Sequence, residues 1–118
     1  MSKNKKTVEK YIDGFEKSDH EQILSCLTED VIWLIPGMFR KSGKKEFDNE
    51  IENENFVGSP AIQVSRMTEE NDVVIAEGNV KSKMKSGELL DASFCDVFEF
   101  ENERIKQLTS FLMKNDNE

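Results

Sequence analysis

Histidine, cysteine and long apolar runs are scarce in this sequence. Among its 118 residues, His20 is the only histidine, and Cys26 and Cys95 are the only cysteines. A single histidine excludes a multi-histidine metal site. The cysteines have neither CxxC spacing nor a histidine cluster beside them, so we expect reduced thiols and no disulfide, zinc ion or other cofactor. Reduced thiols favour a cytoplasmic location.

A membrane segment and a positive net charge are also missing. No stretch approaches the roughly 20 apolar residues of a membrane-spanning helix, and no apolar run follows the basic first residues, 1–6. The 24 acidic and 16 basic residues give a net charge of −8, which would repel nucleic acid and anionic membranes. We therefore expect a soluble, unexported protein with neither as a partner.

Helical spacing governs the first quarter of the chain. Four apolar residues recur three or four positions apart and predict a helix that ends near Lys17 and Ser18. These residues are Val8, Tyr11, Ile12 and Phe15. Asp19 is expected to cap a second, short helix, in which His20 would be a solvated residue at the helix start.

A strand and a third helix are expected next. The apolar run at residues 31–35 ends at Pro36-Gly37 and predicts a strand, and residues 38–43 are expected to form a loop. Phe47 and Ile51 lie one helical turn apart in a charged segment, which predicts a mostly solvated helix.

The rest of the chain alternates with a period of two. From Ala61 onward, turns at residues 69–71, 86–87 and 101–103 would join four antiparallel strands. We therefore predict one α+β domain over residues 1–118, in which three N-terminal helices pack on a mostly antiparallel sheet.

Strand pairing can be estimated from the turn at Ser86-Gly87. A two-residue loop there would place Glu77 opposite Asp96, Asn79 opposite Phe94 and Ile75 opposite Phe98. The phenylalanine face would then lie under the helices. The other face would carry small side chains and form a homodimer contact through the convex side of the sheet. These side chains are Val74, Ala76, Gly78 and Val80 on one strand, and Ser93, Cys95, Val97 and Glu99 on the next.

Several short motifs resemble the SnoaL-like branch of the NTF2-like superfamily, which also contains the ketosteroid isomerases. They are Tyr11, Asp19, the segment 27–37 that ends in Ile35-Pro36-Gly37, Ser42-Gly43, the segment 96–100 and Arg104-Ile105. The resemblance implies a cone-shaped fold with a strongly curved sheet.

The resemblance to ketosteroid isomerase also implies roles for single residues. Its two oxyanion-hole members look matched by Tyr11 and by Asp96. Its general-base aspartate directly precedes the proline-glycine loop, where this sequence has Ile35 before Pro36. An isoleucine cannot carry a proton, so Glu77 is the remaining candidate for the base.

The residues around Asp96 support a special role independently. Phe94 and Phe98 would remove water from its carboxyl group, and a neighbouring Glu77 would add like charge, so both effects would raise its pKa. A neutral Asp96 beside the Tyr11 hydroxyl could donate a hydrogen bond to a carbonyl or enolate oxygen. Alternatively, Asp96 accepts a hydrogen bond from Tyr11 or pairs with Arg66, and only fixes the sheet.

Two functions follow. The first is a small isomerase, cyclase or dehydratase that acts on an apolar carbonyl compound of the polyketide or steroid type, with Tyr11, Asp96 and Glu77 as catalytic residues. The second is a non-catalytic ligand-binding or dimeric scaffolding module. In either case the expected cavity wall is apolar, and it comprises Trp33, Ile35, Phe94, Phe98 and Leu112.

Overall fold

The computed structural model describes residues 1–52 and 55–115, in which three helices pack on one six-stranded sheet. The elements in chain order are α1 (Lys3–Lys17), α2 (His20–Ser25), β1 (Leu27–Ile35), β2 (Phe39–Ser42), α3 (Gly43–Ile51), β3 (Phe56–Glu70), β4 (Val73–Met84), β5 (Leu89–Glu101) and β6 (Arg104–Lys114). The strand order is β2-β1-β6-β5-β4-β3, and only the β1–β6 pair within this sheet is parallel. The expected α+β class and mostly antiparallel sheet are confirmed.

Helix positions follow the expected signals closely. Ser18 takes a left-handed conformation (φ 55°) after the last residue of α1, and Asp19 caps α2 by accepting a hydrogen bond from the Gln22 backbone N–H at 3.0 Å. The prediction of a loop at residues 38–43 is wrong in part, because Phe39–Ser42 forms β2 and pairs with the end of β1. Strand β3 also begins before the expected Ala61.

The estimated register of β4 and β5 is wrong by one residue. The backbone N–H of Met84 donates to the Glu88 carbonyl, and that of Gly87 donates to the Met84 carbonyl, so the turn holds three residues instead of two. Gly87 occupies the left-handed position (φ 94°) that such turns require. Asp96 is therefore opposite Ala76, and Glu77 is opposite Cys95.

This register turns the β4 side chains to the other face. Val74, Ala76, Gly78 and Val80 share the inner face with the phenylalanines of β5 and were wrongly assigned to the outer face. The outer face carries Ile75, Glu77 and Asn79 beside Ser93, Cys95 and Val97. Because successive side chains of a strand alternate in direction, a slip of one residue exchanges the two sets.

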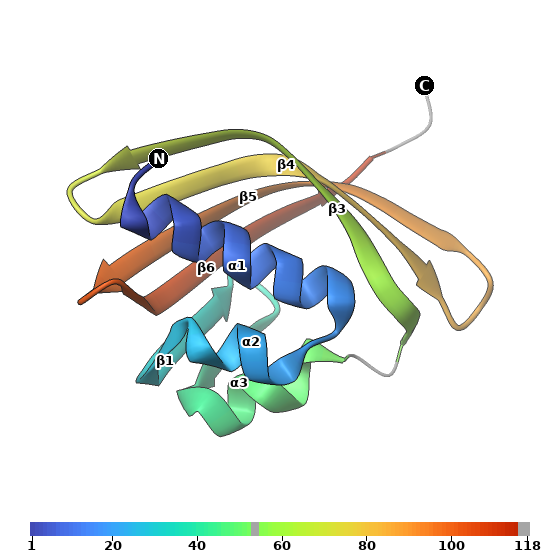
Figure 1. The fold of residues 1–118 in the computed structure, drawn as a ribbon. Helices are drawn as coiled ribbons and strands as arrows, with labels where there is room; N and C mark the ends of the chain where they lie inside the picture. Colours follow the sequence, from blue (N-terminus) through green and yellow to red (C-terminus); the bar gives the residue numbers. More distant parts are fainter. Residues whose placement is uncertain (53–54, 116–118) are drawn as a thin grey trace.

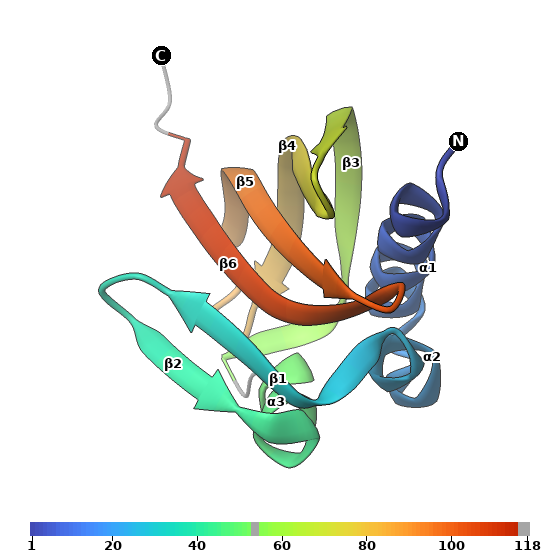
Figure 2. The same ribbon diagram turned by 90° about the vertical axis from the view of Figure 1, so that its left-hand side faces the viewer.

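Helix α1 covers the inner face of the sheet. Figures 1 and 2 show it lying along β3 and β4, while α2 and α3 lie below, next to β1. Aromatic rings join these layers. The Tyr11 ring contacts Phe98 of β5 edge-on, with centroids 5.4 Å apart, and Trp33 of β1 stacks on Phe47 of α3 at 4.5 Å. The helices are thus fixed to the sheet by ring packing. No helix in the described part of the chain is long and apolar enough to cross a membrane.

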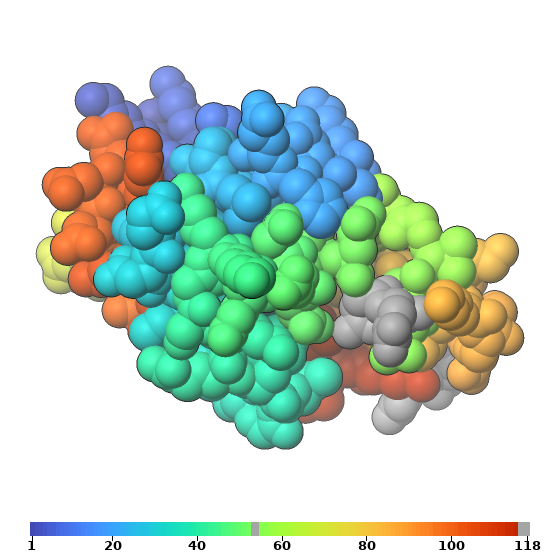
Figure 3. Space-filling model, turned by 90° about the horizontal axis from the view of Figure 1, so that it is seen from below, coloured from blue at the N-terminus to red at the C-terminus, as the bar shows by residue number. Residues whose placement is uncertain are grey.

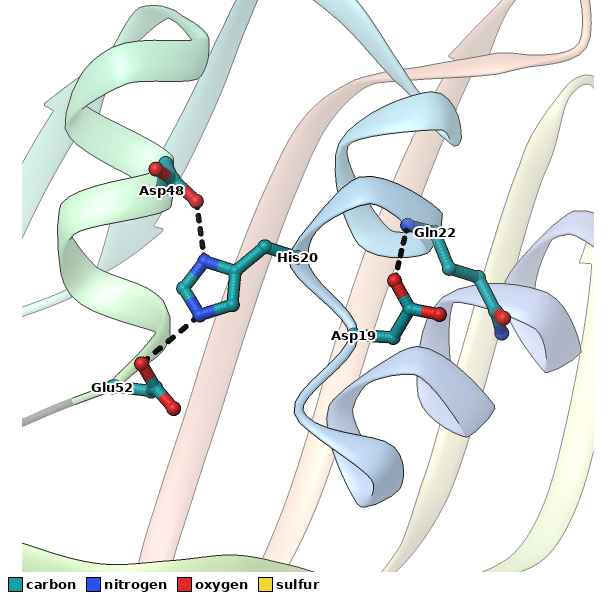
Figure 4. A network of polar contacts seen from close by, with 5 residues as sticks. All are labelled: Asp19, His20, Gln22, Asp48 and Glu52. Atoms are coloured by element: carbon teal, nitrogen blue, oxygen red, sulfur yellow. Dashed lines mark hydrogen bonds and ion pairs between the residues drawn. The ribbon is translucent and has the colours of Figure 1, made fainter.

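His20 links α2 to α3. Its Nδ1 lies 2.5 Å from Asp48 Oδ1 and its Nε2 lies 3.0 Å from Glu52 Oε1, and Figure 4 shows the ring between the two carboxylates. Only the protonated ring offers an N–H donor on both nitrogens. The hydrogen bond to Asp48 is the main reason why the pKa of His20 is raised. The residue does begin a helix, but its ring is paired rather than solvated.

We expect this pairing to make stability depend on pH. Because the folded chain holds the His20 proton more tightly than the unfolded chain, the contribution is complete below about pH 6.5 and disappears as pH rises through the raised pKa. Replacing His20→Gln should remove this dependence and lower the free energy of unfolding by about 1 kcal/mol or less at low pH, since the pair is partly solvent-screened. Urea denaturation across this pH range measures both effects.

The matched control is Glu21→Gln, which removes a neighbouring exposed acid of α2. This variant should keep the wild-type pH dependence. A His20→Gln protein whose stability followed the wild-type pH curve would show that the contact contributes nothing.

Candidate functional site

A cavity of about 200 Å³ lies between α1 and the inner face of the sheet. Its wall is almost entirely apolar, with side chains from α1, β1, β3, β4, β5 and β6. Two of its lining residues carry titratable groups, Tyr11 from α1 and Asp96 from β5, and a third polar residue, Ser110, comes from β6. The site therefore combines an apolar wall with a small group of polar side chains.

Four of the five residues expected on the apolar wall do line this cavity. They are Trp33, Ile35, Phe94 and Leu112. Phe98 does not fit that expectation, because its side chain is fully buried in the core. It packs edge-on against Tyr11, with the ring centroids 5.4 Å apart. Phe98 thus supports Tyr11 from behind and offers no surface to a ligand.

Glu77 lies on the opposite side of the sheet from Asp96. It pairs with Cys95 on the outer face, and its Oε2 accepts hydrogen bonds from Arg66 Nε at 3.0 Å and Arg66 Nη2 at 2.7 Å. The expectation that Glu77 neighbours Asp96 on the inner face is wrong because of the register. The alternative pairing of Asp96 with Arg66 is wrong for the same reason, since the guanidinium is held by Glu77.

Asp96 is mostly enclosed, with part of its surface open to the cavity. Burial raises the pKa of its carboxyl to about 7, and a hydrogen bond with Ser110 acts in the opposite direction. Burial has this effect because the low-dielectric surroundings disfavour the charged form. At neutral pH the carboxyl is therefore present in both its neutral and its ionised forms.

Ser110 connects Asp96 to Trp33. The indole Nε1–H of Trp33 donates to Ser110 Oγ at 3.2 Å, and Ser110 faces Asp96 across the β5–β6 pair. A hydroxyl has one proton, so an Oγ that accepts from Trp33 still has that proton to donate to the carboxylate of Asp96. Side chains from three strands, β1, β6 and β5, thus form one hydrogen-bonded series that runs from Trp33 through Ser110 to Asp96.

Sequence reasoning missed Ser110. The β5–β6 turn pairs Glu101 with Arg104 and Phe100 with Ile105, and this register alone would place Thr109 opposite Asp96. A bulge between Glu99 and Phe100 shifts the pairing by one residue and brings Ser110 there instead. The turn was visible in the sequence, but the bulge was not.

Tyr11 faces the same cavity from the opposite wall. It is 4% exposed, and burial together with the charge of Asp96 raises the pKa of its hydroxyl well above the usual value, so the hydroxyl stays protonated. Within residues 1–52 and 55–115, that hydroxyl has no hydrogen-bond partner. A donor without a partner and an acid near its pKa therefore face one apolar space.

This geometry suits an uncharged molecule with an acceptor oxygen. The oxygen could accept hydrogen bonds from Tyr11 and from neutral Asp96, in surroundings that strengthen both because water is excluded. Across the described residues, no group of three or more histidine, cysteine, aspartate or glutamate side chains is placed to hold a metal ion.

We expect the Asp96 side-chain carboxyl to titrate with a midpoint near 7 when it is followed by carbon NMR. Replacing Ser110→Ala removes a hydrogen bond that favours the ionised form, so the midpoint should rise further. Thr109→Ala, on the neighbouring outward-facing position of β6, serves as the control and should leave the midpoint unchanged. A midpoint near 4 in the wild-type protein would mean that the carboxyl is solvated.

Comparison with known proteins identifies the fold. A family model described as a SnoaL-like domain matches residues 8–108. No curated protein matches the chain in sequence. Among solved structures, an NTF2-like protein of unknown function from Burkholderia pseudomallei is 22% identical, with a TM-score of 0.87, and the match covers 93% of this chain and 90% of that one.

Two further structures are similar. An LEH-like epoxide hydrolase from M. tuberculosis is 17% identical, with a TM-score of 0.83 and coverage of 94% of this chain and 83% of that one. TerC, co-crystallised with polyporic acid, is 19% identical, with a TM-score of 0.84 and coverage of 97% and 92%. At these identities the likeness establishes the fold alone. The match of the family model over residues 8–108 means that this chain belongs to the SnoaL-like domain family.

Proposed function

We propose that this protein binds a small apolar carbonyl compound and catalyses proton transfer next to its carbonyl group, as an isomerase, cyclase or dehydratase would. The helices and a strongly curved sheet would form a cone around the ligand. The observation that carries the proposal is that two groups line one apolar cavity: Asp96, whose pKa is about 7, and a protonated Tyr11. Solved relatives support it only generally, because one is named an epoxide hydrolase and another was crystallised with polyporic acid.

Tyr11 is assigned the role of oxyanion donor. When a proton leaves the carbon beside a carbonyl, negative charge develops on the carbonyl oxygen. A donor that is already in place stabilises that charge without reorganisation, and removing one such donor typically costs about 100- to 1000-fold in rate. The absence of a competing partner for the Tyr11 hydroxyl within the described chain supports this role.

Asp96 is assigned two roles, one for each protonation state. In its neutral form it donates a second hydrogen bond to the ligand oxygen. In its ionised form it accepts the proton from carbon and can return it to another position. A general base is most effective when its pKa lies near the working pH, which the value of about 7 satisfies. Glu77 faces away, and Ile35 cannot carry a proton, so among the lining residues that the structure describes no other would share this task.

The second candidate function is binding without catalysis. It is favoured by the small number of titratable groups on the described cavity wall, which are Tyr11 and Asp96. A separate base is present in many carbonyl isomerases, and a site without one can hold a ligand through the two donors and do nothing further.

Exchange of the protons beside the carbonyl of hexan-2-one in D₂O, followed by NMR, distinguishes the two functions. We expect the wild-type protein to accelerate exchange with a pH midpoint near 7. Asp96→Asn should keep ligand binding, because its amide still donates, but should reduce exchange by roughly 100-fold or more. Asp96→Ala should lose both, and Tyr11→Phe should weaken both.

The control is Glu77→Gln on the outer face, which should leave exchange unchanged. Binding without accelerated exchange would establish the second function. Equal ketone affinity of Asp96→Asn and Asp96→Ala would contradict the donor role of Asp96 in either function.

We also propose that two copies associate through the outer face of the sheet. Val97 and Cys95 of β5 lie on this face beside Phe111 and Met113 of β6, which are 49% and 72% exposed. An apolar surface of this kind commonly marks an interface. Because identical faces can pair across a two-fold axis, a homodimer is the simplest arrangement that covers it.

Light scattering after size-exclusion chromatography should therefore report a dimer. We expect Phe111→Glu to shift the protein toward the monomer, because it places a charge at the centre of the contact. Val57→Glu changes a residue of the edge strand β3 that is also 49% exposed and should leave the dimer intact. A wild-type monomer at tens of micromolar would contradict the proposal.

A further inference from the structure

A second cavity adjoins the first and is larger. Its volume is about 370 Å³, against about 200 Å³ for the cavity that holds Tyr11 and Asp96. We call them the outer and the inner cavity. Pockets for drug-sized ligands measure about 300–1,000 Å³, so the inner cavity alone admits only a small head group. A larger ligand that reaches Asp96 would have to extend beyond the inner cavity, and the apolar outer cavity offers room for it.

The two cavities share an apolar wall. Six residues line both of them, and none carries a charge: Phe15, Trp33, Ile35, Pro60, Val80 and Leu112. The wall common to the two cavities therefore has no charged or polar side chain that would oppose an alkyl chain or a ring lying along it. Trp33 lies at this junction and stacks on Phe47 of α3, whose side chain is fully buried.

Further apolar side chains line the outer cavity. Phe39 comes from β2, Ile51 from α3, and Leu90 from β5. Figure 3 shows α3, in green, on the underside of the molecule next to β2, and the last two residues of this helix, Glu50 and Ile51, line the cavity. The side chains are placed to cover an apolar tail on several sides.

Both charged residues in the described lining of the outer cavity are acids. Glu52 accepts a hydrogen bond from His20 at 3.0 Å, and Glu50 lies 3.9 Å from Lys41 Nζ. No lysine, arginine or histidine belongs to the described lining of either cavity. Both acids already have a cation beside them, so a carboxylate or phosphate at the far end of a ligand would meet two carboxylates and no unpaired cation among the described lining residues, in a protein of net charge −8.

From this arrangement we infer that the ligand is an elongated, uncharged molecule. Its carbonyl head occupies the inner cavity, and its hydrocarbon tail lies in the outer cavity against Leu90, Ile51 and Phe39. The inference rests on the proposed function for the carbonyl head group. It adds the length of the ligand and the absence of charge on its tail. Carbonyl compounds that end in a carboxylate or carry a phosphate are excluded as good ligands.

A series of unbranched ketones from pentan-2-one to undecan-2-one tests the inference at about pH 6, where Asp96 is mostly neutral. Binding can be followed through the fluorescence of Trp33, the only tryptophan. Each added methylene should tighten binding by about two- to fourfold until the outer cavity is full, in line with the free energy of burying a methylene. The undecan-2-one chain with a terminal carboxylate should bind at least tenfold more weakly than the ketone itself.

Leu90→Glu should abolish the dependence on chain length, so that undecan-2-one binds no more tightly than pentan-2-one. Leu89→Glu is the matched control, because Leu89 is 73% exposed and lies outside both cavities. Circular dichroism checks the fold of both variants, and Leu90→Gln replaces Leu90→Glu if the charge prevents folding.

The possible failures are distinguishable. Affinity that is independent of chain length, or that is equal for the ketone and its carboxylate, overturns the elongated ligand while the dependence on Asp96 stands. Binding that grows with chain length but is unaffected by Asp96→Ala overturns the proposed head-group site. The absence of saturable binding by every ketone overturns both.

Discussion

The pairing of β4 with β5 is the constraint on which the site depends. The three-residue turn that includes Gly87 sets this register, and the register decides whether Glu77 shares the inner face with Asp96. With it, Asp96 enters an apolar cavity and Glu77 meets Arg66 on the outer face. A shift of β4 by one residue would turn Glu77 to the inner face beside Asp96, because strand side chains alternate in direction. A backbone conformation several residues away thus decides the chemistry of the cavity.

The surroundings of Asp96 on the inner face keep the pKa of its carboxyl between two extremes. An acid buried without partners would be neutral at all ordinary pH values, and a fully solvated one would be ionised. Here burial raises the pKa and the Ser110 hydroxyl, oriented by Trp33, limits the rise. Tyr11 is held differently, by Phe98 behind it and by Phe15 beside it at 5.1 Å, and it keeps its proton. The two groups therefore have distinct protonation behaviour within one cavity.

The sequence predicted what depends on local signals. The helix that carries Tyr11, the cap at Asp19 and the inward phenylalanine face of β5 all follow from spacing along the chain, and all are present. The family resemblance also matches the observed fold. These features depend on a few neighbouring residues, which is why a single sequence is enough to find them.

Long-range features were harder to predict. Glu77 was assigned to the wrong face because the length of one turn was misjudged by a residue, and Ser110 was missed because a bulge has no clear signature in the residues around Glu99. His20 looked solvated because Asp48, its partner, lies far along the chain on another helix. Each of these errors concerns which distant residues meet, and local patterns do not contain that information.

The parallel pairing of β1 with β6 also has a consequence for how folding ends. Trp33 pairs with Leu108, so the wall that encloses Asp96 requires segments from opposite parts of the chain, and such non-local contacts form slowly. Before they form, the Asp96 carboxyl is solvated and ionised at neutral pH. Afterwards its pKa is about 7, so completing the fold near that pH takes up about half a proton from the solvent. Closure of the cavity is thereby coupled to proton uptake.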